Sequence, residues 1–212
     1  MAAETPKPTR GARLEVWGLF LTLAIVFAGV ALEYPRDEAT FTPARCFFWG
    51  PDDYTHVYRA KIIARGEAHR IRHMSKINYP EGVELHWTAP MDYLLAGAAL
   101  LARPLIDHPD PIGVAAAWLP VVLGGLYVLV MMTWVRGRFG LGPAVLVGLF
   151  VILSPPFHRA FALGHPDHHA LLEWLFVVTI GVWAPPLRNG HTQDAPTRWG
   201  AVVSGLAAGL AI

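Results

Sequence analysis

Long apolar runs alternate with short charged segments along most of this chain. The first run covers residues 16–32, and further runs cover residues 112–135, 141–157 and 171–187. Another apolar run begins at residue 199 and continues to residue 212. A helix needs about 17 to 25 apolar residues to cross a bilayer. The pattern therefore predicts an all-α polytopic membrane protein with about five transmembrane helices, the fifth (199–212) being truncated.

The first apolar run follows a polar and basic tail, residues 1–15. A cleaved signal peptide has a similar order of charges, but its apolar region is only about 7 to 15 residues long and a small-residue cleavage site follows it. No such site follows residues 16–32. We interpret this run as an uncleaved membrane anchor with the tail inside.

Residues 33–111 are charged, aromatic and interrupted by prolines, which is typical of a loop or small domain outside the bilayer. Within this loop Tyr54, Tyr58 and Ile62 recur every fourth residue, a spacing that predicts an amphipathic helix. A second helix is predicted over Met91–Ile106. This stretch is apolar, but its sixteen residues are fewer than the roughly 17 to 25 that cross a bilayer.

Positive charges orient the predicted helices. Arg136 and Arg138 follow the run at residues 112–135, and Lys and Arg are enriched in inside loops. Counting crossings from an inside tail then places the loop 33–111 and a second loop, 158–170, on the same outer face. Met91–Ile106 cannot be a full crossing in this arrangement, so we expect it to lie at the outer interface.

The composition agrees with a membrane protein, because 54% of the 212 residues are apolar and only 16% are charged. The net charge of +1 offers no basic surface for nucleic acid. Cys46 is the single cysteine, which excludes an intrachain disulfide and leaves the redox compartment open.

The second outer loop holds the densest group of metal-ligand side chains, in the stretch "GHPDHHALLE". Its candidate ligands are His165, Asp167, His168, His169 and Glu173. In an extended or turning segment Asp167 and His169 point the same way, and His169 and Glu173 share a face once a helix starts. Carboxylates with one imidazole suit Mn²⁺ or Mg²⁺ better than a structural zinc site. The alternative is that Asp167 only caps the next helix.

The first outer loop begins with a second acidic motif, "PDDYTHVYRA". Asp52 and Asp53 follow Pro51, where carboxylates cap the start of a helix, and an ordinary amphipathic helix explains them equally well. If Asp53 and Asp167 share one ion instead, their oxygens must lie within about 5 Å of each other. A separation above about 15 Å would exclude a shared site.

The order of these parts resembles the catalytic subunit of oligosaccharyltransferases, which are C-type membrane glycosyltransferases. In that family the first outer loop carries an essential acid about six residues before an arginine, and Asp53 and Arg59 in "DYTHVYR" match this spacing. The second outer loop carries an Asp-x-His motif, matched by Asp167 and His169. The "NYPEG" turn and the apolar helix after it match further elements.

The resemblance implies that Asp53, Asp167 and His169 bind a divalent cation, with Asp53 and Asp167 catalytic. It implies a donor-phosphate role for Arg59, and Asp52, His168 and Glu173 are secondary candidates. The substrates would be a polyprenyl-(pyro)phosphate-linked glycan and a protein or glycan acceptor. The acceptor-binding Trp-Trp-Asp motif lies further along the family's chains, so we expect this piece to be inactive alone.

We expect an integral, multi-pass protein of a bacterial inner (plasma) membrane, with its site on the periplasmic or extracytoplasmic side. Two other classes remain open. An ion or solute transporter or channel subunit would carry polar residues deep within several spans. In a noncatalytic membrane scaffold, replacing Asp53 or Asp167 would change neither metal binding nor turnover.

Overall fold

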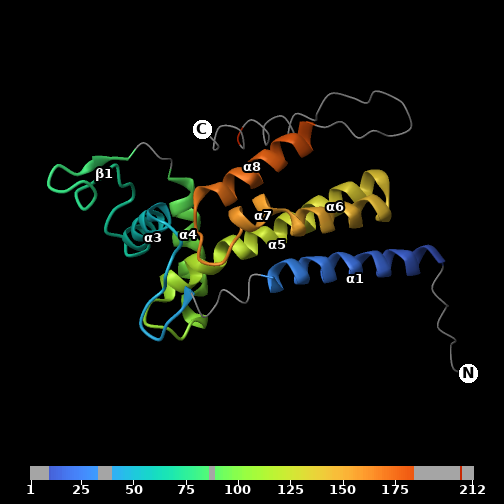
Figure 1. Ribbon diagram of the computed structural model, residues 1–212, viewed down its shortest axis with the longest axis horizontal. Coiled ribbons are helices and arrows are strands. Elements are labelled where there is room, and N and C mark those ends of the chain that lie inside the picture. The colour runs from blue at the N-terminus through green and yellow to red at the C-terminus, as the bar shows by residue number, and fades with distance from the viewer. Residues whose placement is uncertain (1–9, 33–39, 86–88, 184–205, 207–212) are drawn as a thin grey trace, which may run out of the picture.

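Long helices lie lengthwise in the molecule, and most of the shorter elements gather at one end (Figure 1). The computed structural model describes residues 10–32, 40–85, 89–183 and Leu206. Its elements, in chain order, are α1 (Arg10–Ala31), α3 (Pro51–Ala64), β1 (His73–Met74), β2 (Val83–Glu84), α4 (Pro90–Ala102), the 3₁₀ helix η2 (Arg103–Leu105), α5 (Pro111–Phe139), α6 (Leu141–Leu153), α7 (Pro155–Ala160) and α8 (His168–Trp183). The strands β1 and β2 pair antiparallel, with His73 opposite Glu84.

Local sequence signals begin and end several of these helices. Asp110 caps α5, because its side chain accepts a hydrogen bond from the Gly113 amide at 3.0 Å. Ser154 ends α6 and begins α7, where its hydroxyl accepts from the amide of Phe157 at 3.4 Å. Pro155 follows Ser154 directly and suits the first position of a helix, since it has no amide hydrogen to satisfy.

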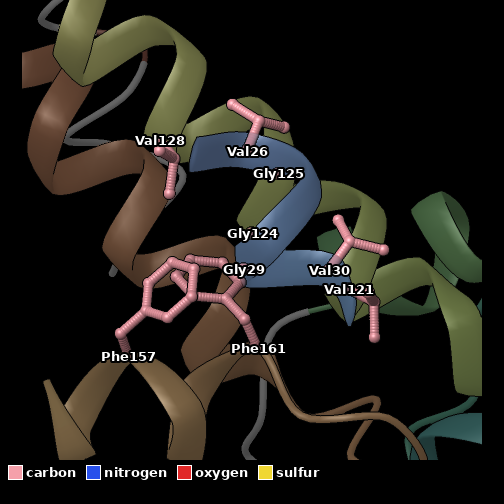
Figure 2. Close-up of a pocket in the computed structure, with 9 residues that line it drawn as sticks. All are labelled: Val26, Gly29, Val30, Val121, Gly124, Gly125, Val128, Phe157 and Phe161. Atoms are coloured by element: carbon pink, nitrogen blue, oxygen red, sulfur yellow. The ribbon is translucent and has the colours of Figure 1, made fainter. Parts of the chain in front are cut away.

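Helix α5 is the centre of the fold and packs against α1, α4, α6 and α8. Gly124 and Gly125 allow close packing on two sides of it. Beside Gly124, the rings of Phe157 and Phe161 occupy the space that a side chain would take, and on α1 Val26 approaches Gly125 (Figure 2).

An apolar cluster joins α3 and α4 to α5. Its fully or almost fully buried members are Val57, Ala60, Met91, Leu95, Ala96 and Ala116. The predicted interfacial helix Met91–Ile106 thus corresponds to a helix with one face in a protein core.

The expectation of about five membrane-spanning helices is wrong for the part of the chain that the structure describes. There, α5 alone is long and apolar enough to cross a membrane, and half of its apolar window is buried. The apolar helical stretches Phe20–Ala31, Leu141–Leu153 and His168–Ile180 are shorter. Thirteen residues of helix rise only about 20 Å, whereas the hydrocarbon core of a bilayer is about 30 Å thick.

The overestimate has a physical cause that α6 illustrates. The predicted span at residues 141–157 counted apolar residues through Pro155 and Pro156, but the helix stops at Leu153 because Ser154 takes extended backbone angles. Apolar runs therefore continue past the ends of the helices that contain them. The predicted fifth span at residues 199–212 lies outside the described residues, apart from Leu206.

Candidate functional site

The start of α3, helix α7 and the start of α8 surround a cleft of about 560 Å³. It is lined by Gly50, Pro51, Asp52, Asp53, Pro156, Arg159, Ala160, His165, Asp167, His169 and Glu173. The two acidic motifs of the sequence therefore meet at one cleft, although more than a hundred residues separate them.

Asp53 is placed by the first turn of α3. Its side chain is only 1% exposed, and Oδ2 accepts a hydrogen bond from the backbone amide of Gly50 at 2.8 Å. The His165 ring lies against both carboxylate oxygens, with Nδ1 at 2.9 Å from Oδ1 and 3.1 Å from Oδ2. Oδ1 is buried and accepts no hydrogen bond within the described part of the chain. A helix cap therefore holds Oδ2 of the carboxylate, and the ring of His165 lies against both oxygens.

The loop before α8 is held by backbone hydrogen bonds to two distant segments. The Gly164 amide donates to the Ala117 carbonyl at 3.1 Å, and the Trp49 amide donates to the Gly164 carbonyl at 3.2 Å. Gly164 has φ +77°, a conformation that favours glycine. The indole of Trp49 stacks on His165, with ring centroids 5.3 Å apart. Together these contacts turn His165 toward Asp53.

Asp167 is buried and surrounded by histidines. Its Oδ1 accepts from the His168 amide at 2.6 Å and also contacts His168 Nδ1, while Oδ2 accepts from His169 Nδ1 at 2.7 Å. Burial alone raises the pKa of Asp167, but the hydrogen bonds from His168 and His169 outweigh burial and hold that pKa below its ordinary value. The hydrogen bond to Asp53 raises the pKa of His165, against the opposing effect of burial. The cleft thus favours a charged Asp167 carboxylate.

Asp53, His165 and Asp167 each offer one ligand atom, and these atoms lie within 4.8 Å of one another. This spacing satisfies the limit of about 5 Å for ligands that share one ion. Two carboxylates and one imidazole are donors that a divalent cation accepts, and the buried Oδ1 of Asp53 fits such an ion. His169, the imidazole expected from the resemblance, contacts Asp167 but is 61% exposed and lies outside this group.

His165 is one of the candidate ligands that its motif predicts, but it was left out of the metal set implied by the resemblance. The secondary candidates lie at two different places in the structure. Asp52 and Glu173 line the cleft and are exposed, whereas His168 belongs to a second cluster on the far side of Asp167.

The structure does not bring Arg59 to the cleft. Its guanidinium is 1% exposed, and Nη2 lies 2.6 Å from Oδ2 of the fully buried Asp92. Oδ1 of Asp92 in turn lies 2.7 Å from Nδ1 of His56. The phosphate role of Arg59 stays a prediction, and Arg159 is a cation that does line the cleft. Asp92 was missed, because an acid in the first turn of a helix is ordinarily explained by the exposed amides there.

No family model matches the chain. Over 170 residues it is 28% identical to dolichyl-phosphooligosaccharide-protein glycotransferase 1 of Archaeoglobus fulgidus, a match that covers 77% of this chain and 28% of that relative. The chain resembles the N-terminal portion of an archaeal oligosaccharyltransferase. The family resemblance drawn from the motifs is therefore confirmed.

Solved structures of the Archaeoglobus fulgidus oligosaccharyltransferase share this fold. A complex with Zn and sulfate has a TM-score of 0.71 at 21% identity and covers 90% of this chain. The enzyme AglB with an inhibitory peptide and a dolichol-phosphate has a TM-score of 0.69 at 20% identity and covers 93% of this chain. The chain spans about a quarter of the length of these proteins, 24% and 23% respectively. Since they are archaeal, the expected bacterial inner membrane has no support.

Proposed function

We propose that this chain is part of a membrane glycosyltransferase that moves a glycan from a polyprenyl-(pyro)phosphate donor to an acceptor, using a divalent cation in the cleft. The observation that carries the proposal is the convergence of Asp53 and Asp167 on the cleft, with ligand atoms within 4.8 Å. The similarity to an archaeal oligosaccharyltransferase supports the same reaction class.

In this proposal Asp53, Asp167 and an imidazole, from His165 or His169, hold the cation. A bound Mn²⁺ or Mg²⁺ would supply Lewis-acid stabilisation of the charge on the leaving phosphate. A related structure holds Zn and sulfate, which supports a cation and an anion site in this fold. The Asp167 carboxylate is suited to this role, because the hydrogen bonds to it lower its pKa and favour its charged form.

One further residue of the cleft suits a phosphate group on the donor. The exposed guanidinium of Arg159 presents a planar fork of N–H donors that matches phosphate oxygens. Arg59 would act at a distance, by holding Asp92 and His56 in place. Related structures contain a dolichol-phosphate in one case and an acceptor peptide with an NVT sequon in another. These support a lipid-linked donor and favour a peptide over a glycan as acceptor.

The test uses the full-length protein in lipid nanodiscs with a polyprenyl-pyrophosphate oligosaccharide and a fluorescent sequon peptide. We expect Asp53→Asn and Asp167→Asn each to lower transfer by at least about 100-fold, since even outer-shell partners of a metal are worth about 10- to 100-fold. Asp107→Asn is the matched control, because Asp107 is exposed and does not line the cleft. Transfer at the control rate in both cleft variants would refute the role of the two carboxylates, whereas absence of transfer in the wild type would favour a noncatalytic scaffold.

A further inference from the structure

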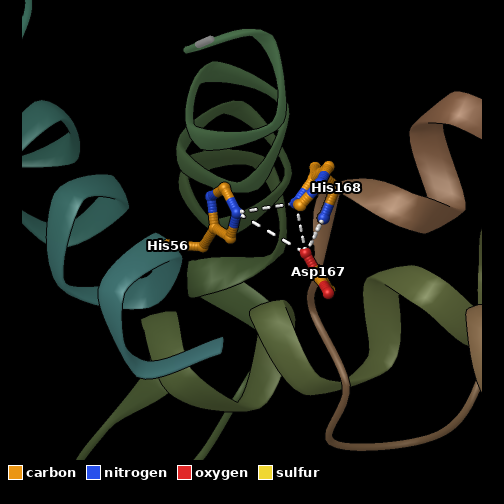
Figure 3. Close-up of side chains that lie close together, drawn as sticks. All are labelled: His56, Asp167 and His168. Atoms are coloured by element: carbon orange, nitrogen blue, oxygen red, sulfur yellow. Dashed lines mark hydrogen bonds and ion pairs between the residues drawn. The ribbon is translucent and has the colours of Figure 1, made fainter. Parts of the chain in front are cut away.

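A second group of ligand side chains lies on the other side of Asp167. His56, Asp167 and His168 each offer one ligand atom, and these atoms lie within 4.8 Å of one another (Figure 3). Nε2 of His56 lies 3.4 Å from Nδ1 of His168 and 3.7 Å from Oδ1 of Asp167. These residues come from α3 and from the start of α8, so the group forms only when the two elements meet.

The Nδ1 edge of the His56 ring is hydrogen-bonded to a carboxylate, as is usual for metal-binding histidines. Such histidines usually donate their other ring N–H to a carboxylate, which sets the tautomer and the ring orientation. Nδ1 of His56 lies 2.7 Å from Oδ1 of Asp92, and Arg59 pairs with the second oxygen of Asp92 at 2.6 Å. With the proton of a neutral ring on Nδ1, Nε2 presents its lone pair toward His168 and Asp167.

Asp167 divides its two oxygens between the two groups. Oδ1 faces His56 and His168, whereas Oδ2 faces His169 at 2.7 Å and Nε2 of His165 at 3.9 Å. A carboxylate in this position bridges two neighbouring sites. The two sites differ in chemistry, since the cleft side is rich in carboxylate oxygen and the far side offers two imidazole nitrogens.

We propose that His56, His168 and Asp167 form a second cation site, specific for a borderline transition-metal ion such as Zn²⁺ and bridged to the cleft by Asp167. Two imidazoles and one carboxylate are a common zinc ligand set, whereas Mg²⁺ and Mn²⁺ favour oxygen ligands. A tetrahedral ion with bonds of about 2.0 to 2.1 Å separates its ligands by about 3.3 Å. The separations of 3.4 Å and 3.7 Å from His56 Nε2 are close to that value.

Entry of the ion requires one local movement. His168 Nδ1 now contacts Oδ1 of Asp167 directly, and the ion would replace this contact. The His168 side chain is 35% exposed, which leaves it room to rotate, while the side chains of His56 and Asp167 are only 0% and 6% exposed and remain in place. The site therefore has two fixed ligands and one adjustable ligand.

This inference goes beyond glycan transfer, and its test measures metal alone. The purified full chain is stripped with a chelator and titrated with Zn²⁺ and with Co²⁺ by equilibrium dialysis. We expect two equivalents in the wild type, one in His168→Gln, one in Asp53→Asn and none that is tight in Asp167→Asn. Excess Mg²⁺ should displace the ion that Asp53→Asn loses and leave the ion that His168→Gln loses. His73→Gln is the matched control, since His73 is exposed and pairs with Glu84 outside both groups.

One equivalent in the wild type, or two in His168→Gln, would overturn the second site. His168→Gln is preferred to a change at His56 because His168 is partly exposed, and circular dichroism checks its fold. The outcome is distinct from a failure of the proposed function. If the wild type binds two ions but transfers no glycan, the proposed function is refuted and the second cation site stands. If it transfers glycan with a single bound ion, the second site is refuted and the proposed function stands.

Discussion

Replacing Gly164 with alanine tests whether the loop before α8 is seated closely enough to aim His165. Gly164 has φ +77°, and a Cβ there would lie 3.0 Å from Oγ1 and 3.1 Å from Cγ2 of Thr40, and 3.3 Å from the Phe47 carbonyl. Thr40 is only 4% exposed, so it has little room to give way. The substitution therefore combines a backbone cost with a steric cost.

Gly66→Ala is the matched control for the backbone cost. Gly66 has φ +70°, and an added Cβ would meet nothing within 4 Å, so this variant bears the cost of the left-handed conformation alone, about 1 to 2 kcal/mol. Crowding in a packed site adds about 1 to 3 kcal/mol at Gly164. Denaturant unfolding in detergent should show the larger loss for Gly164→Ala, and its Co²⁺ affinity should fall while that of Gly66→Ala is kept.

Two results would refute this reasoning. Equal losses of unfolding free energy in the two variants would show that Thr40 and Phe47 do not confine the loop. A destabilised Gly164→Ala with unchanged Co²⁺ affinity would show that the position of the loop does not govern the ligands beside it.

Two further predictions concern buried polar groups. Arg59→Met should lower the free energy of unfolding by about 3 to 5 kcal/mol, because it leaves the carboxylate of Asp92 buried without its cation. Arg65→Met is the control. It removes an exposed ion pair with Glu67 at 3.7 Å and should cost less than about 1 kcal/mol. Equal losses of unfolding free energy in the two variants would contradict a buried pair of Arg59 and Asp92. Burial raises the pKa of the Cys46 thiol from 9.0 to about 11, so at pH 8 the folded chain should react with iodoacetamide about 100-fold more slowly than the denatured chain. Equal alkylation rates would show that Cys46 is exposed.

Features set by neighbouring residues were readable from the sequence. The start of α3 at Pro51 depends on residues within one turn. The predicted apolar repeat of Tyr54, Tyr58 and Ile62 is not the buried face of this helix, since Tyr54 is 46% exposed and the helix buries His56, Val57 and Ala60 instead. The family resemblance rested on similarly local motifs, the Asp53 to Arg59 spacing and the Asp-x-His at Asp167, and it is confirmed.

Features that depend on distant packing were not readable. His165 faces Asp53 because Gly164 hydrogen-bonds to Ala117 and Trp49 stacks on the ring, and none of these contacts is local. Asp92 lies on the predicted interfacial helix, and only the packing of α3 against α4 shows that it is the buried partner of Arg59. The number of spans was overestimated because hydropathy records composition and not the residue at which a helix stops.

The order of the site residues along the chain has a consequence for biosynthesis. His56 and its partner Asp92 are 36 residues apart, so at about 5 to 20 residues per second the ribosome makes the second about 2 to 7 s after the first. Asp53 and His165 are 112 residues apart, a delay of about 6 to 22 s. The α3–α4 pair can therefore dock early during translation, before His165 has been synthesised to contact the Asp53 carboxylate. A nascent chain that stalls before α8 would carry a folded helix pair and an unfinished site.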